Sequence, residues 1–315
     1  MGGFNAESTT DQVIEGISLA GDIALVTGAS SGLGVETSRA LAAAGAEVVM
    51  LARDEAKLAA AADTLRQGNP DATFHTHLVD LASLDSVRHA ADELRRKYPA
   101  IQLLINNAGV MACPLLRTAD GFEMQFGTNH LGHFLLTCLL QPSLVAGAPG
   151  RVVNLSSGGH KFANFNFDDP NYAQRDYDKW QAYGESKTAN VLFTVALDAR
   201  LQGSGVRSLA VHPGVIMTEL SRHMQQEDFE SLSARAPGDG GLTFKSVEQG
   251  AATSTWAATS PDLVDCGGLY LEDCQVAEPA GPGSGNGVED YALDTAAAER
   301  LWSLSEELVG ERCAF

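Results

Sequence analysis

A tyrosine and a lysine four residues apart, Tyr183 and Lys187, form the pair in this sequence best suited to proton transfer. On a helix, residues four apart share one face. There the ammonium group can lower the pKa of the phenol, so that the tyrosine acts as an acid or a base near neutral pH. The pair therefore predicts acid–base chemistry at Tyr183. The plainer alternative is an exposed helix that carries both residues without any chemistry.

A glycine-rich turn near the start of the chain is the second candidate. It reads Thr-Gly-Ala-Ser-Ser-Gly-Leu-Gly over residues 27–34 and joins an apolar run, residues 23–26, to a helix-forming stretch, residues 36–44. Glycines let backbone N–H groups at a helix N-terminus approach a pyrophosphate closely, and the helix dipole favours the anion. The turn predicts a binding site for the phosphates of a dinucleotide, although ordinary turn chemistry would also use such glycines.

The elements that would position both groups alternate along the chain. Apolar strands are expected at residues 23–26, 47–51, 73–79, 101–105, 151–155, 206–211 and 268–271. Helices are expected at residues 35–44, 55–66, 84–98, 126–140, 183–201, 247–258 and 294–309. The alternation predicts an α/β fold, a Rossmann-type doubly wound parallel sheet of about seven strands in a single domain with a C-terminal extension. The ligand is then expected at the carboxyl ends of the strands.

Composition narrows the classes of function. The 315 residues include 21 Lys and Arg against 40 Asp and Glu, a formal net charge of −19 that would repel the phosphates of nucleic acid. No apolar run reaches the ~18 residues of a membrane-spanning helix. Residues 1–20 lack the pattern of a secretion signal, and the five cysteines show no disulfide framework. We therefore expect a protein of a reducing compartment, the cytoplasm, with neither a nucleic-acid nor a membrane partner.

The order of motifs along residues 19–275 resembles that of the short-chain dehydrogenase/reductase family. The motifs are the glycine turn at 27–34, Asn-Asn-Ala-Gly at 106–109, Asn129, the serines at 156 and 157, Tyr-x-x-x-Lys at 183–187 and Pro-Gly at 213–214. The glycine spacing differs from Gly-x-Gly-x-x-Gly and is similar to the short-chain variant of the fingerprint. The lead-in at 9–21, the long spacing from serine to tyrosine and the ending at 270–274 are most similar to the branch of retinol dehydrogenases and WW-domain oxidoreductases.

The resemblance also implies a division of the chain. We expect an N-terminal extension over residues 1–18, the dehydrogenase domain over residues 19–275 with insertions at 158–182 and 219–245, and a linker with a C-terminal helix over residues 276–315. Proline and glycine are concentrated in residues 279–287, which predicts a flexible linker there.

By the same resemblance, four residues would take part in catalysis. Tyr183 would exchange a proton with the substrate oxygen while hydride moves at the nicotinamide. Lys187 would hold the nicotinamide ribose and lower the pKa of Tyr183. Ser157, rather than Ser156, would hydrogen-bond the substrate oxygen, and Asn129 would kink its helix and anchor a water. The residues expected at the cofactor are Gly28, Ser30, Ser31, Gly32, Leu33, Gly34, Arg53, Asp80, Leu81, Asn107, Ala108, Gly109, Tyr183, Lys187, Pro213, Gly214, Ile216 and Thr218.

The residues after the second strand distinguish NAD from NADP. An acidic side chain there binds the ribose 2′-OH of NAD, whereas an arginine accommodates the 2′-phosphate of NADP. In this chain Ala52 stands at the acidic position and Arg53 follows, while Asp54 is placed to cap the next helix. We expect NADP(H), with NAD(H) as the alternative.

Aromatic residues are dense in the insertion at 158–182, and they indicate the class of substrate. Phe162, Phe165 and Trp180 would line an apolar pocket for a lipophilic secondary alcohol or ketone, such as a steroid, a retinoid-like or an aryl compound. The alternative is that these rings only pack the insertion onto the domain. The second insertion contains three glycines as expected hinges, Gly238, Gly240 and Gly241.

Other interpretations of the sequence stay open. A non-catalytic NADP-binding sensor or scaffold would be expected to have lost Tyr183 or Lys187, which are both present. A reductase of a small polar carbonyl remains an alternative, whereas a sugar-nucleotide epimerase would need a larger C-terminal domain. His130 and His133 lie three apart without a third ligand, so we expect no metal. The family's habit of pairing helices like those at 129–146 and 183–201 implies a homo-oligomer, a dimer or a tetramer.

Overall fold

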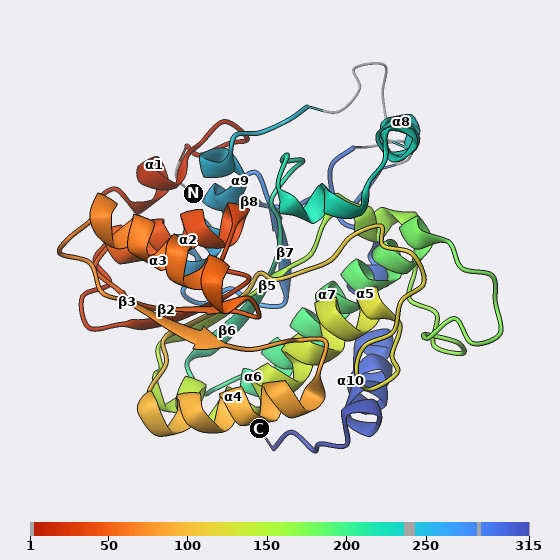
Figure 1. Ribbon diagram of the computed structural model, residues 1–315, viewed down its shortest axis with the longest axis horizontal. Coiled ribbons are helices and arrows are strands. Elements are labelled where there is room, and N and C mark those ends of the chain that lie inside the picture. Colours follow the sequence, from red (N-terminus) through yellow and green to blue (C-terminus); the bar gives the residue numbers. More distant parts are fainter. Residues whose placement is uncertain (1–2, 236–242, 282–284, 315) are drawn as a thin grey trace.

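The computed structural model describes residues 3–235, 243–281 and 285–314, and within this part of the chain one eight-stranded sheet forms the core (Figure 1). Its strand order is β3-β2-β1-β4-β5-β6-β7-β8. The strands are β1 (Ile23–Thr27), β2 (Glu47–Ala52), β3 (Phe74–Leu78), β4 (Leu103–Asn106), β5 (Gly150–Leu155), β6 (Val206–His212), β7 (Leu269–Glu272) and β8 (Gln275–Val276). All strand pairs from β3 to β7 are parallel, so the predicted Rossmann-type doubly wound fold is confirmed.

β8 was not expected from the sequence, and it runs antiparallel to β7. It contains two residues, too few for a pattern to indicate, and follows a two-residue turn in which Asp273 and Cys274 both have positive φ. Such a turn matches the twist of paired strands. The strand order reverses its direction between β1 and β4, and a doubly wound sheet binds its ligand at this point.

Helices cover both faces of the sheet, which explains why the central strands are mostly apolar and buried. One face carries α1 (Thr10–Ile14), α2 (Gly32–Ala43), α3 (Glu55–Gly68) and α9 (Val247–Thr259). The other face carries α4 (Leu84–Lys97), α6 (Gly132–Ala146), α7 (Lys179–Leu201) and α10 (Thr295–Val309). The shorter elements are α5 (Met124–Phe126), η1 (Gly127–Leu131), η2 (Gly158–Phe162), η3 (Glu219–His223), α8 (Gln226–Arg235), η4 (Pro261–Leu263) and η5 (Asp290–Ala292).

The two ends of the chain pack onto this domain. At the N-terminal end α1 contacts α2 and α9, and Arg39 of α2 pairs with Asp11 at 2.6 Å. At the C-terminal end α10 lies beside α7 (Figure 1), where Trp302 contacts the rings of Phe134 and Phe193. Phe134 lies in α6 and Phe193 in α7, and these are the helices whose pairing between subunits was expected to form a homo-oligomer. In this structure α10 covers part of the surface of these two helices. The association state and the domain boundaries stay predictions.

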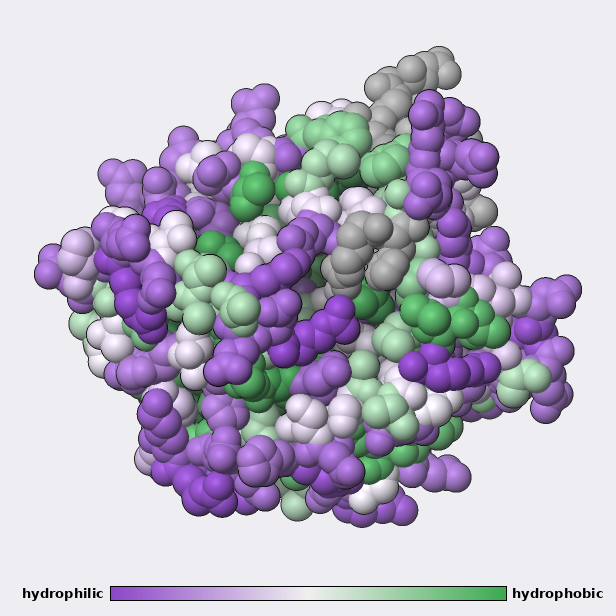
Figure 2. Space-filling view, in the orientation of Figure 1, coloured by the Kyte–Doolittle hydropathy of each residue, from purple (hydrophilic) through white to green (hydrophobic). Residues whose placement is uncertain are grey.

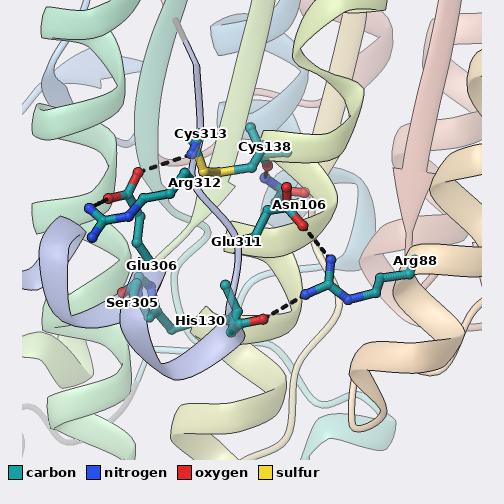
Figure 3. Close-up of a disulfide and its surroundings, with 11 residues drawn as sticks. Arg88, Asn106, His130, Cys138, Ser305, Glu306, Glu311, Arg312 and Cys313 are labelled. Carbon is teal, nitrogen blue, oxygen red and sulfur yellow. Dashed lines mark hydrogen bonds and ion pairs between the residues drawn. A yellow bond between two sulfur atoms is a disulfide. The ribbon is translucent and has the colours of Figure 1, made fainter.

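A disulfide joins Cys138 in α6 to Cys313 beyond α10 (Figure 3). The expectation that the cysteines form no disulfide was therefore wrong. The two residues are 175 positions apart in the sequence. They meet because α10 packs on the same face of the sheet as α6. Arg88 of α4 holds the same chain end through an ion pair with Glu311 and a hydrogen bond of 2.6 Å to the carbonyl oxygen of Val309. The cysteines therefore no longer support a reducing compartment. The cytoplasmic location of the protein stays a prediction without that support.

The Pro- and Gly-rich stretch at 279–287 is not a free linker where the structure describes it. Ala280 N–H donates to Val288 O at 2.8 Å, and Gly287 N–H donates to the carboxylate of Glu272 at 2.6 Å. Gly287 has φ +94°, and a Cβ there would lie 2.8 Å from the carbonyl oxygen of Glu278. These contacts attach the described parts of the stretch to the β7 side of the sheet.

The face shown in Figure 2 is largely hydrophilic, with hydrophobic residues in smaller patches between the hydrophilic ones. Of the helices in the described ranges, none combines the length and the apolar character that crossing a bilayer requires.

Candidate active site

A cavity of about 820 Å³ opens at the carboxyl ends of the parallel strands. Its walls contain every residue that the sequence analysis placed at the cofactor, and also Ser157, Phe162 and Trp180. The predicted hinge glycines Gly238, Gly240 and Gly241 lie outside the described residues. Motifs spread over nearly 200 positions thus meet in one hollow, because parallel strands all end at the same edge of the sheet.

The glycine turn at one end of the cavity leaves no room for side chains. A Cβ on Gly34 would lie 2.3 Å from the carbonyl oxygen of Gly28, and a Cβ on Gly28 would lie 2.8 Å from Cα of Ala108. Gly28 also has φ +67°, which favours glycine. The turn is thus a tight backbone cradle at the N-terminus of α2, suited to bind a pyrophosphate.

Hydrogen bonds lock the Asn-Asn-Ala-Gly motif onto this turn. The Asn107 amide donates to the carbonyl oxygen of Thr27 at 2.7 Å, and the Thr27 hydroxyl accepts from the backbone N–H groups of Asn107 and Ala108, both at 2.9 Å. Two motifs 80 positions apart therefore form one rigid unit.

Tyr183 and Lys187 lie on one face of α7 at the other end of the cavity, and both are almost fully buried. Burial raises the pKa of Tyr183 to about 12, and a hydrogen bond with Ser157 opposes that rise. Burial also lowers the pKa of Lys187 to about 8. The Lys187 ammonium donates to the carbonyl oxygen of Leu155 at 3.0 Å and lies 5.7 Å from the centre of the Tyr183 ring. On balance burial dominates and the pKa of the phenol is raised. That Lys187 lowers the pKa of Tyr183 stays a prediction.

The two serines at the end of β5 have different partners. Ser156 Oγ donates to the carbonyl oxygen of Lys187 at 2.9 Å and so turns toward the backbone of α7. Ser157 Oγ accepts from Gly159 N–H at 3.0 Å, which leaves its own proton free to be donated to the phenol or to a substrate oxygen. The geometry thus favours Ser157 for contact with the substrate.

A sequence model of the family described as short chain dehydrogenase matches residues 22–228. The chain belongs to the short-chain dehydrogenase family. It is 43% identical over 290 residues to human "Retinol dehydrogenase 13", with 92% of this chain and 85% of the relative covered. A crystal structure of an uncharacterized protein from Mycobacterium Paratuberculosis has a TM-score of 0.75 and 36% identity, with both chains fully covered. The "Pseudomonas aeruginosa RhlG/NADP active-site complex" has a TM-score of 0.63 and 27% identity over 81% of this chain and 95% of that one. The retinol dehydrogenase-like branch is confirmed, and the protein is an oxidoreductase of the alcohol–carbonyl class with a nicotinamide dinucleotide site.

The cavity of this dehydrogenase fits such a dinucleotide. The glycine cradle would hold the pyrophosphate, while Arg53, Lys57 and Asp80 line the end beyond β2 and β3, where the adenosine half would lie. Asp54 caps α3 by accepting from Lys57 N–H at 3.0 Å, the role expected from its position. Arg53 follows the strand end beside the uncharged Ala52, so this edge of the cavity presents a guanidinium group.

Asn129 of the dehydrogenase does not line the cavity, although the sequence analysis placed it among the catalytic residues. It lies fully buried in the π-helical turn η1, between α5 and α6. Its side chain accepts from Val110 N–H at 2.8 Å and donates to Val110 O and to Ser186 Oγ, both at 3.0 Å. The π-helical turn interrupts the regular helix at the place where a kink was expected. The hydrogen bonds of Asn129 hold the segment after Gly109 against α7.

The aromatic residues of the insertion divide into two groups. Phe162 and Trp180 line the cavity and meet edge to face with ring centres 6.2 Å apart. Phe165 was expected beside them, and this was wrong. It is buried in the core with its ring 5.1 Å from Phe126 and 4.9 Å from Phe167, so packing against α5 directs it away from the cavity.

Two glycines that the motifs did not include hold the catalytic end of the dehydrogenase together. A Cβ on Gly159 would lie 2.7 Å from the Tyr183 ring, and a Cβ on Gly184 would lie 2.9 Å from the carbonyl oxygen of Gly159. Gly184 directly follows Tyr183 and Gly159 lies two residues after Ser157, so closeness to motif residues is the sequence signal for both glycines. Glu289 also lines the cavity, but it lies more than 100 positions from Tyr183 and no sequence signal marked it.

The two histidines of η1 and α6 have structural partners. His130 Nε2 lies 2.8 Å from Ser305 Oγ, and His133 Nε2 lies 2.9 Å from Thr27 Oγ1. Burial lowers their pKa values to about 3 and about 4. In residues 3–235, 243–281 and 285–314, no three His, Cys, Asp or Glu side chains cluster in a way that could hold a metal ion.

Proposed function

We propose that this protein interconverts a lipophilic secondary alcohol and its ketone with NADP(H), with Tyr183 as the acid and base. The observation that carries the proposal is that Ser157, Tyr183 and Lys187 meet in a cavity that is also lined by a cluster of apolar side chains. The cluster consists of Met111, Phe162, Trp180, Met224, Phe229 and Leu232. The human relative is named a retinol dehydrogenase, and this name supports a lipophilic substrate.

The bound nicotinamide would accept or supply the hydride. In the direction of reduction, Tyr183 is protonated at neutral pH because burial holds its pKa high, so it can donate its proton to the substrate oxygen. Ser157 would donate a second hydrogen bond to that oxygen and stabilise its developing charge. Lys187 would bind the ribose hydroxyls and supply positive charge when protonated. In the direction of oxidation, the phenolate of Tyr183 is needed, so the rate should rise with pH.

A panel of steroid, retinoid and aryl ketones, assayed by the loss of NADPH fluorescence, tests this proposal. We expect turnover of bulky apolar ketones with a higher kcat/KM than for small polar carbonyls such as short sugars. A preference for the small polar carbonyls would support a polar-substrate reductase instead. NADPH binding without turnover of any compound would support the sensor or scaffold.

The cofactor preference is expected to follow Arg53. The wild type should have a higher kcat/KM with NADPH than with NADH, because the guanidinium group can pair with the 2′-phosphate. Ala52→Asp combined with Arg53→Ala should reverse this order, since the new carboxylate would repel the phosphate and accept from the 2′-OH. Paired assays of both enzymes with both cofactors measure it. A wild type that prefers NADH would contradict the assignment.

Phe162→Ala is expected to raise KM for a bulky apolar ketone by about tenfold or more, since lost contact with an apolar group in a pocket is worth about 1–3 kcal/mol. The Kd for NADPH should not change, because the Phe162 side chain packs beside Gly184, next to Tyr183, and not at the glycine cradle. Phe165→Ala is the matched control from the same insertion. It should lower the Tm through a core cavity and leave KM unchanged. The same rise in KM for both variants would contradict the division of the two rings.

A further inference from the structure

The turn after Ser157 is connected to the C-terminal segment of residues 285–291. Glu289 N–H donates to Nε2 of His160 at 3.2 Å, and the Tyr291 hydroxyl donates to the carbonyl oxygen of His160 at 2.8 Å. The Lys161 ammonium donates to the carbonyl oxygen of Gly285 at 2.7 Å. A segment that the sequence places far beyond the motifs is thus attached to η2, the turn that starts directly after the catalytic serine.

His160 also contacts Ser157 itself. Its Nδ1 lies 2.7 Å from the carbonyl oxygen of Ser157. A carbonyl oxygen can only accept, so Nδ1 carries the proton, and a backbone N–H can only donate, so Nε2 does not. The two contacts therefore require the same neutral tautomer. Burial lowers the pKa of His160 to about 4, which keeps the ring neutral at physiological pH.

The ring of His160 has little freedom to move. It is fully buried, and the Tyr270 ring packs on it at 4.9 Å with the Tyr270 hydroxyl 3.3 Å from Nδ1. Ser157 is in consequence held at its hydroxyl by Gly159 N–H and at its carbonyl by two donors of His160, the backbone N–H at 3.0 Å and Nδ1 of the ring. Substitutions of the His160 side chain remove or replace only the contact of the ring. Gly285 and Glu289 line the same cavity as Ser157, so the segment borders the site that it supports.

We propose that His160 is a positioning residue, which orients Ser157 through Nδ1 and is itself held in place by the C-terminal segment through Nε2. The inference rests on the proposed function, because it needs Ser157 to meet the reacting oxygen. Through these two contacts of His160, the C-terminal extension helps to position Ser157 in the active site.

Asparagine and glutamine separate the two contacts of the ring. The amide nitrogen of asparagine can take the place of Nδ1, and the amide oxygen of glutamine can take the place of Nε2. His160→Asn keeps a donor for Ser157 O and loses the acceptor for Glu289 N–H, and His160→Gln does the reverse. We expect His160→Gln to lower kcat by about ten- to a hundredfold, the effect of a small misplacement of a catalytic group. His160→Asn should retain most of kcat, and both should bind NADPH with the wild-type Kd.

Two substitutions at Glu289 test the other contact of the ring. Glu289 has φ −72°, which proline can adopt. Glu289→Pro removes the N–H that His160 accepts, and the proline ring occupies the space of that hydrogen bond. Glu289→Ala, the matched control, keeps the N–H and removes only the carboxylate. Both variants lose the carboxylate, which lines the cavity, so the alanine variant is the reference for the proline variant. We expect kcat to be lower in the proline variant than in the alanine variant, with the same Kd for NADPH in both.

Three results would overturn the inference. One is equal kcat for His160→Asn and His160→Gln, and another is equal kcat for Glu289→Pro and Glu289→Ala. The third is a fall in kcat that is accompanied by an equal loss of NADPH affinity and a lower Tm, which would indicate a general effect on folding. If the wild type is active, any of these results contradicts only the role of His160 and leaves the proposed function standing. A wild type that turns over no alcohol or ketone overturns the proposed function, and the positioning role with it.

Discussion

Tyr183→Phe is expected to lower kcat by a factor on the order of 10² to 10⁴, the usual contribution of one positioned acid or base. The phenylalanine ring fills the same buried space on α7, so α7 and the cavity should keep their shape. The Kd for NADPH should therefore change little. Steady-state kinetics with an apolar ketone and titration of NADPH fluorescence measure the two quantities separately.

Tyr177→Phe is the matched control for this experiment. Tyr177 is also a tyrosine with its hydroxyl in hydrogen bonds, donating to the carbonyl oxygen of Cys113 at 3.0 Å, but it does not line the cavity. We expect it to keep the wild-type kcat. A variant Tyr183→Phe that kept more than about a tenth of the wild-type kcat would have lost too little activity for a missing acid. Another proton donor would then have to serve the reaction.

Lys187→Met is expected to weaken the binding of NADPH and to change how stability depends on pH. Burial lowers the pKa of Lys187 from 10.5 to about 8, so between these values the unfolded chain holds a proton that the folded protein does not. The wild type should then gain free energy of unfolding, relative to the variant, as the pH rises through this window. The gain is about 1.4 kcal/mol per pH unit within the window.

Urea denaturation of both proteins at a pH below and a pH within this window measures the effect. Tyr183→Phe is a useful control if the second pH is kept between 8 and 10, since Tyr183 changes the pH dependence of stability only between its ordinary pKa of 10.0 and its raised pKa of about 12. A difference between wild type and Lys187→Met that is the same at both pH values would show that Lys187 titrates normally. Wild-type affinity for NADPH in the variant would remove Lys187 from the cofactor site.

The fold class could be predicted because it depends on local patterns. The central strands read as short, mostly apolar runs and are buried on both faces, and the helices between the strands cover the sheet. The candidate cofactor residues could also be predicted as a group. They follow strand ends, and parallel strands bring those ends to one edge, where the structure shows a common cavity. Their individual roles stay predictions.

The sequence by itself determined the sheet, the glycine cradle and the tyrosine–lysine pair, since these arise from residues close together in the chain. Tertiary structure alone decided which aromatic ring reaches the cavity, where Asn129 points, which cysteines pair and that residues 285–291 support Ser157. It also decided the pKa of Tyr183, which burial raises although a lysine lies one helical turn away. Each of these depends on contacts between distant segments or on exclusion of water. Neither the contacts between distant segments nor the exclusion of water can be read from local patterns in a single sequence.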